Sequence, residues 1–71
     1  MKIRLGDSTL FSDLLTFLRR NGCIAYMSDG TDAVEALRPH SFGRQEEDEL
    51  RLLVQTWQLG HPDVVVDIEL S

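Results

Sequence analysis

CIAYMSDGTDAVEALR, residues 23–38, is the stretch of the sequence that decides the fold. Its first five residues form a short, mostly apolar run that predicts a strand over residues 23–27. Asp29-Gly30 follows, and this pair predicts a tight hairpin because both central residues of a type I′ turn need a positive φ. The returning strand is expected over residues 31–38, since Pro39 has no N–H to donate to a sheet ladder.

A strand and an amphipathic helix are predicted before this hairpin. Ile3 and Leu5 alternate with basic residues, which is typical of a short strand with one buried face. Asp7 and Ser8 predict the start of a helix, because their side-chain oxygens accept hydrogen bonds from the free amides of a first turn. The helix has one broad apolar stripe, made by Leu10, Phe11, Leu14, Leu15, Phe17 and Leu18. Asn21-Gly22 supplies a left-handed end.

A second helix and a last strand are predicted after the hairpin. Acidic residues crowd the run from Gln45 to Glu49, which indicates the positive end of a helix dipole. The buried stripe of this helix is expected to contain Leu50, Leu53, Val54 and Trp57. Gly60 and Pro62 are expected to end the helix. The last strand is predicted from the alternation of Val64, Val66, Ile68 and Leu70 with Val65, Asp67 and Glu69.

The order β-α-β-β-α-β predicts a single α+β domain over residues 1–71 with a ferredoxin-like, two-layer sandwich fold. Two helices with one apolar stripe each need one apolar sheet face to cover, so both are expected on the same face of an antiparallel sheet of order 4-1-3-2. Lys2 and Arg4 of the first strand would then lie beside Asp67 and Glu69 of the last strand. Cross-strand pairs of opposite charge stabilise a sheet by roughly 0.2–1 kcal/mol each.

Composition narrows the possible partners. The 71 residues carry a net charge of −5, so neither nucleic acid nor an anionic membrane is expected as a partner. Cys23 is the sole cysteine, which excludes an internal disulfide and favours a reducing compartment. The first residues lack the apolar core of a signal peptide, so the cytoplasm is the expected location. Since short chains have marginal stability, a homodimer or another protein partner is expected.

No residue pattern in the sequence predicts catalysis, a cofactor site or a metal site. His40 and His61 lie in segments rich in Pro and Gly and are interpreted as turn residues. Cys23 is interpreted as a small buried side chain, with Arg19 and Arg20 directed to solvent. Consecutive acidic residues on a helix point in different directions, so the run from Gln45 to Glu49 is interpreted as a solvated face.

One candidate surface remains. If Cys23 and Ala25 face the helices, Ile24 and Tyr26 project from the opposite face of the sheet, where Val65 and Ala33 are also expected. Apolar side chains on an exposed sheet face indicate a docking surface. The leading hypothesis is therefore a non-enzymatic module for protein interaction or self-association, acting through this face or through an edge strand.

The segment from Asp7 to Ile24 resembles the opening of ACT domains, which are small regulatory modules that bind amino acids. The matching features are an Asp after the first strand, an apolar helix, and Gly22-Cys23-Ile24 leading into the second strand. The resemblance implies a ligand loop at Asp7, Ser8 and Thr9, and a small-molecule-binding regulatory domain is the alternative hypothesis. Heavy-metal-associated domains share the topology, but this loop has no CxxC motif. The whole chain also resembles short bacterial proteins of the same topology.

Overall fold

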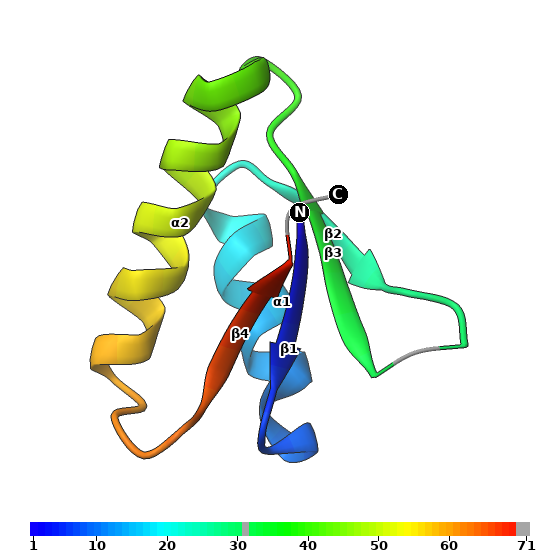
Figure 1. Ribbon diagram of the computed structural model, residues 1–71, viewed down its shortest axis with the longest axis vertical. Coiled ribbons are helices and arrows are strands. Elements are labelled where there is room, and N and C mark those ends of the chain that lie inside the picture. The colour runs from blue at the N-terminus through cyan, green and yellow to red at the C-terminus, as the bar shows by residue number, and fades with distance from the viewer. Residues whose placement is uncertain (31, 70–71) are drawn as a thin grey trace.

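Four strands form one sheet, and two helices pack against it in the computed structural model, which describes residues 1–30 and 32–69 (Figure 1). The elements in chain order are β1 (Lys2–Leu5), the 3-10 turn η1 (Ser8–Leu10), α1 (Phe11–Arg20), β2 (Ile24–Met27), β3 (Ala33–Leu37), α2 (Gly43–Leu59) and β4 (Val66–Glu69).

The sheet has the strand order β2-β3-β1-β4, and every adjacent pair is antiparallel. Read from the other edge, this is the predicted order 4-1-3-2, so the predicted neighbours of each strand are confirmed. β1 therefore lies inside the sheet with β3 and β4 on either side, while β2 and β4 are its edges.

Both helices cover the same face of the sheet, because a single hydrophobic core contains side chains from each of them. The fully buried members of this core include Ile3, Leu14, Leu18, Val34, Leu50 and Val54. Val64, Val66 and Ile68 pack against the core from the side of β4, as their alternation predicts. The other sheet face, which we call the open face, is left uncovered by the helices (Figure 1).

Three backbone hydrogen bonds show toward which neighbouring strand the peptide group of each strand residue points. Gly6 N–H donates to Val65 O at 2.9 Å, Ala36 N–H to Met1 O at 2.9 Å, and Ser28 N–H to Ala33 O at 2.8 Å. Peptide groups of successive residues in a strand point in opposite directions. Combined with the registers, these bonds direct the peptide groups of Val66 and Ile68 away from β1 at one edge. Those of Ala25 and Met27 point away from β3 at the other edge.

The hairpin between β2 and β3 exists, but the predicted tight turn is wrong. Gly30 has a φ of 72°, whereas Asp29 does not have the positive φ that a type I′ turn requires. Because Ser28 bonds to Ala33, the loop is longer and β3 begins at Ala33. A two-residue loop would have put the charged Asp32 inside the strand, on the side occupied by Val34. The longer loop keeps this carboxylate exposed. Thr31 and Leu70, assigned to strands in the sequence, lie outside the described residues.

The helix boundaries follow their predicted signals with small shifts. Asp7 caps the first turn, which is a 3-10 turn, so α1 itself begins at Phe11. Gly22 has a φ of 83°, which confirms the left-handed end of that helix. α2 begins at Gly43, ahead of the acidic cluster, and ends at Leu59 with Gly60 as its C-cap.

The charges on β1 and β4 pair as the topology predicts. Lys2 is opposite Glu69 and Arg4 is opposite Asp67 in the register of β1 and β4. The ion pair that forms is diagonal, with Arg4 Nε 3.1 Å from Glu69 Oε1. Both side chains are about half exposed, so the pair adds little to stability and serves mainly to favour this register.

We predict that Leu50→Ala destabilises the domain by about 2–5 kcal/mol, because it removes a fully buried side chain and leaves a cavity. Leu52→Ala, on the exposed side of the same helix, is the matched control and should change stability by less than about 0.5 kcal/mol. Urea titration followed by circular dichroism measures both. Equal losses in the two variants would contradict this description of the core.

Candidate functional site

The open face carries a small apolar patch where β2 meets β3. Ile24 lies directly opposite Leu37, and Tyr26, two residues further along β2, lies opposite Glu35. Their exposed fractions are 51% for Ile24, 48% for Tyr26 and 39% for Leu37. We call these three side chains the β2–β3 patch. Such a group of large apolar side chains on a sheet face is a feature of contact surfaces.

The structure brings some of the predicted surface residues together and separates others. Ile24 and Tyr26 come together as expected, and Leu37 joins them, although the sequence reasoning missed it. The alternation of side chains along β3 could have identified Leu37. Because Val34 and Ala36 face the core, Leu37 must face the other way. Val65 is 72% exposed but lies beside Gly6 at the far side of the sheet, with β3 and β1 between it and β2.

Ala33 is on the open face by register, yet it is fully buried. The longer side chain of Arg4 lies directly opposite it in the ladder. Ala33 therefore shares the open face, as expected, but it adds no exposed surface there.

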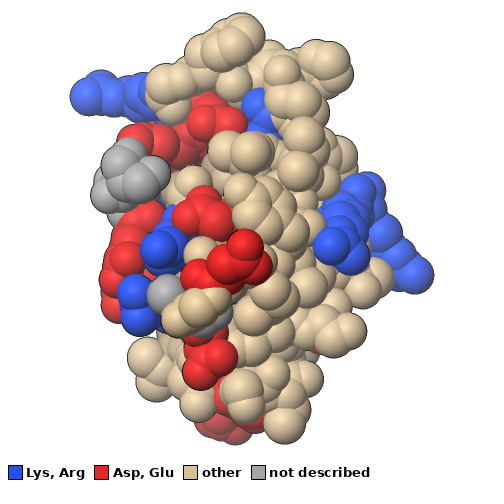
Figure 2. All heavy atoms as spheres, turned by 90° about the vertical axis from the view of Figure 1, so that its right-hand side faces the viewer, with Lys and Arg blue, Asp and Glu red and all other residues tan. Residues whose placement is uncertain are grey.

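Most of the remaining side chains of the open face are charged. Glu35, Lys2 and Glu69 follow one another across β3, β1 and β4, and Arg4 with Asp67 forms the next row. In Figure 2, acidic and basic side chains are interspersed along one margin of the molecule, and a broad uncharged area lies beside them. The β2–β3 patch therefore has a rim that carries both signs of charge.

Arg19 occupies the outer edge of β2. Its Nε and Nη2 donate to Ala25 O at 3.0 and 2.8 Å. The N–H of Cys23, at the start of the same edge, donates to Leu18 O at 3.0 Å. Arg19 is exposed, as expected, but its guanidinium is held at this edge by the Ala25 carbonyl, which the sequence did not predict. A side chain that fills an edge in this way hinders the addition of another strand there.

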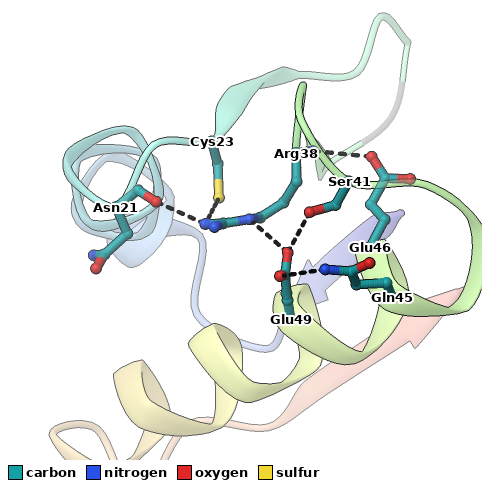
Figure 3. Close-up of polar contacts among 7 residues, drawn as sticks. All are labelled: Asn21, Cys23, Arg38, Ser41, Gln45, Glu46 and Glu49. Carbon is teal, nitrogen blue, oxygen red and sulfur yellow. Dashed lines mark hydrogen bonds and ion pairs between the residues drawn. The ribbon is translucent and has the colours of Figure 1, made fainter.

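A polar network joins the ends of three elements and is shown in Figure 3. Arg38, at the end of β3, donates from Nε to Glu49 Oε2 at 3.1 Å and from Nη1 to Asn21 O at 2.7 Å. Its backbone N–H donates to Glu46 Oε2 at 2.9 Å. The guanidinium thus links the end of α1 with the first turns of α2.

Glu49 is the acceptor at the centre of this network. The Ser41 hydroxyl donates to Oε2 at 2.5 Å, and Gln45 Nε2 lies 3.4 Å from Oε1. The Ser41 hydrogen bond is the largest cause that lowers the pKa of the Glu49 carboxyl, and Gln45 and Arg38 act in the same direction. The acidic run is therefore not simply a solvated face, since Glu46 and Glu49 turn toward β3 and the loop after it.

Cys23 lies beneath the same guanidinium. Its thiol is buried, as the sequence predicted, and its sulfur is 3.9 Å from Arg38 Nη1. This contact is the largest cause that raises the pKa of the Arg38 guanidinium. The sequence does not reveal this role of Arg38, because its partners come from segments distant along the chain.

A groove of about 330 Å³ runs between α1 and α2, with Asp13, Arg20, Trp57 and His61 in its lining. Trp57 is buried, as predicted, and its Nε1 donates to Asp13 Oδ2 at 2.8 Å. The His61 ring stacks on Trp57 with a centroid distance of 4.2 Å. Its Nε2 lies 3.4 Å from Asp13 Oδ2 and its Nδ1 3.1 Å from Trp57 O. Both ring nitrogens thus face protein oxygens rather than the groove.

The loop implied by the ACT resemblance is a capped turn. Asp7 Oδ1 accepts from Thr9 N–H at 3.0 Å and from Thr9 Oγ1 at 2.6 Å. These hydrogen bonds, that of the Thr9 side chain first, lower the pKa of the Asp7 carboxyl. Asp7, Ser8 and Thr9 are brought together at the surface, and Asp7 Oδ1 already has two donors from Thr9. His40 is likewise an exposed residue of a turn.

Comparison with known proteins gave no relative: the chain matches no protein-family model, no curated protein and no solved structure. Within residues 1–30 and 32–69, no three or more His, Cys, Asp or Glu side chains gather where they could hold a metal ion. No helix in that part of the chain has both the length and the apolar character needed to cross a membrane.

We predict that Glu49→Gln reduces the loss of stability on acidification. The pKa of Glu49 is lower in the folded than in the unfolded chain, so its carboxylate adds stability above its ordinary pKa of 4.5. That stability disappears as the pH falls through the lower, folded-state value. Urea midpoints at neutral pH and at about pH 3 test this, and the gap between them should narrow in the variant.

Asp48→Asn is the matched control, since this exposed carboxylate is the neighbour of Glu49 on the same helix. An unchanged gap in Glu49→Gln, or the same narrowing in both variants, would show that the Ser41 and Arg38 contacts do not act on Glu49 in solution.

Proposed function

We propose that this domain is a non-enzymatic module for protein interaction, with the β2–β3 patch as its contact surface. The observation that carries the proposal is that Ile24, Tyr26 and Leu37 lie together, each more than a third exposed, on a face that the helices do not cover. Two side chains that could take part in catalysis, His61 and Glu49, are engaged in contacts within the fold. Both nitrogens of His61 face acceptors, and Glu49 is held by Ser41, Gln45 and Arg38.

A second copy of the chain is the partner that we propose for this patch. A twofold axis brings the same surface of both copies together, so an apolar patch is complementary to itself. Lys2 and Glu35 flank the patch on the same face, and a twofold arrangement can place Lys2 of one copy against Glu35 of the other. Three side chains are far fewer than the 20 or so per side of a stable interface, which predicts weak, reversible association.

The finer fold assignment is part of this proposal. The order β-α-β-β-α-β, with β1 and β3 in the middle of the sheet, supports a ferredoxin-like arrangement. The free, buried thiol of Cys23 fits a reducing compartment such as the cytoplasm.

Binding of a small molecule is the second candidate function, and the groove between α1 and α2 is the observation that favours it. Its volume of about 330 Å³ is at the lower end of the range for ligand pockets. It combines the stacked Trp57 and His61 rings with the opposite charges of Asp13 and Arg20. A regulatory domain of the ACT type would instead use Asp7, Ser8 and Thr9, where the structure shows a capped turn.

We predict that the wild-type domain self-associates at high concentration and that Ile24→Thr with Tyr26→Thr abolishes this, because the double variant removes most of the patch. Sedimentation velocity over a concentration series measures the effect, and circular dichroism checks the fold. Leu59→Gln is the matched control, because Leu59 is a highly exposed apolar residue away from the sheet. A wild-type protein that stays monomeric at millimolar concentration would remove the second copy as partner.

A thermal-shift screen with amino acids and nucleotides tests the second candidate. A ligand at one hundred times its Kd should add about 2.7 kcal/mol to the stability of the folded chain. A shift that Arg20→Gln abolishes would place the ligand in the groove, whereas a shift that Thr9→Ala abolishes would place it at the capped turn. The absence of any shift would count against small-molecule binding.

A further inference from the structure

The outer edge of β4 differs from the outer edge of β2. The peptide groups of Val66 and Ile68 point away from β1, and no hydrogen bond from the described residues reaches them. At β2, by contrast, Arg19 fills the corresponding position at Ala25 O. An edge with two successive free peptide groups is a template for the addition of a further strand.

The side chains of β4 define what kind of strand fits this edge. Asp67 and Glu69 are exposed on the open face, and Val66 and Ile68 are half-buried on the side of the helices. β1 already satisfies this pattern on the inner side of β4. Lys2 and Arg4 lie opposite the two carboxylates, and Ile3 and Leu5 lie opposite the two apolar side chains.

A strand at the outer edge meets the same two rows of side chains as β1 does, because the alternation of β4 presents them equally to both neighbours. Basic residues in alternate positions would neutralise Asp67 and Glu69 on the open face. Apolar residues in the remaining positions would extend the cover over Val66 and Ile68 toward α2.

We propose that the β4 edge binds an extended segment of a different protein in which basic and apolar residues alternate. This surface goes beyond the proposed function, because it is separate from the β2–β3 patch and recognises a partner of another chemistry. Backbone hydrogen bonds to Val66 and Ile68 hold the segment, and the carboxylates of Asp67 and Glu69 select its basic side chains.

A second copy of the chain is a poor occupant of this edge. Antiparallel pairing of β4 with its counterpart would bring Asp67 and Glu69 of one copy against the same residues of the other. Like charges in adjacent positions of a sheet destabilise the pairing. The carboxylates therefore act against self-pairing and in favour of a basic segment.

The probe for this proposal is the peptide acetyl-Lys-Ile-Arg-Leu-Lys-Val-amide, with acetyl-Glu-Ile-Glu-Leu-Glu-Val-amide as its matched control. The two-dimensional amide NMR spectrum of the full chain reports where each peptide binds. We expect the basic peptide to shift the amides of Val66 and Ile68 and to slow their hydrogen exchange, and the acidic peptide to leave them unchanged. Binding of both peptides alike, or of neither, would overturn the proposal.

Two variants test the two parts of the edge separately. Asp67→Asn with Glu69→Gln should weaken peptide binding roughly two- to thirtyfold, because two cross-strand charge pairs are lost. Val66→Pro should abolish binding, since it removes an N–H that β1 does not use, whereas Val66→Thr should retain it. If Val66→Pro does not fold, N-methylation of alternate peptide residues removes the same hydrogen bonds from the other side and should likewise abolish binding.

The patch variant separates this proposal from the proposed function. Ile24→Thr with Tyr26→Thr should bind the basic peptide as tightly as the wild type, even where self-association is lost. Shifts centred on Ile24 and Tyr26 would assign the peptide to the patch and refute the β4 site. Wild-type self-association that the patch variant retains and Val66→Pro abolishes would show that a second copy occupies the edge, which also refutes it.

Discussion

The alternation of side chains along β1 is the constraint on which the rest of the structure depends. Ile3 is fully buried between neighbours from β3 and β4, and Lys2 and Arg4 project from the other face. Because β1 pairs on both sides, its two faces set the inner and outer faces of the whole sheet. A shift of one residue would turn its basic side chains into the helices and leave Ile3 exposed, so the register is strongly specified.

The predictions that depended on periodicity were confirmed, whereas the tight turn at Asp29-Gly30 was wrong and the contacts of Arg19 and Arg38 were missed. The stripe of α1 and the alternation of β4 are local patterns that burial enforces, so the sequence reveals them. The turn at Asp29 depends on where Asp32 must go, which only the pairing of both strands decides. Arg19 and Arg38 donate to acceptors several residues away or on other elements, and no residue spacing in the sequence predicts such contacts.

The candidate surfaces were likewise predicted only in part. Ile24 and Tyr26 followed from the faces of one strand, but Leu37 became part of the patch only through its pairing with Ile24. Val65 was expected beside them because it shares their face, yet two strands lie between, and face alone says nothing about position across a sheet. The β4 edge became visible only when the direction of each peptide group was known, which requires the register of every strand.

Arg38 has a consequence for how the domain comes apart. Arg38 follows the end of β3, its guanidinium and backbone N–H contact the end of α1 and the beginning of α2, and Cys23 lies against the guanidinium. Fraying at any of these termini would break contacts belonging to the other two. The three ends should therefore open together rather than one by one, which gives a small chain a cooperative transition at the place where separate helices and strands usually loosen first.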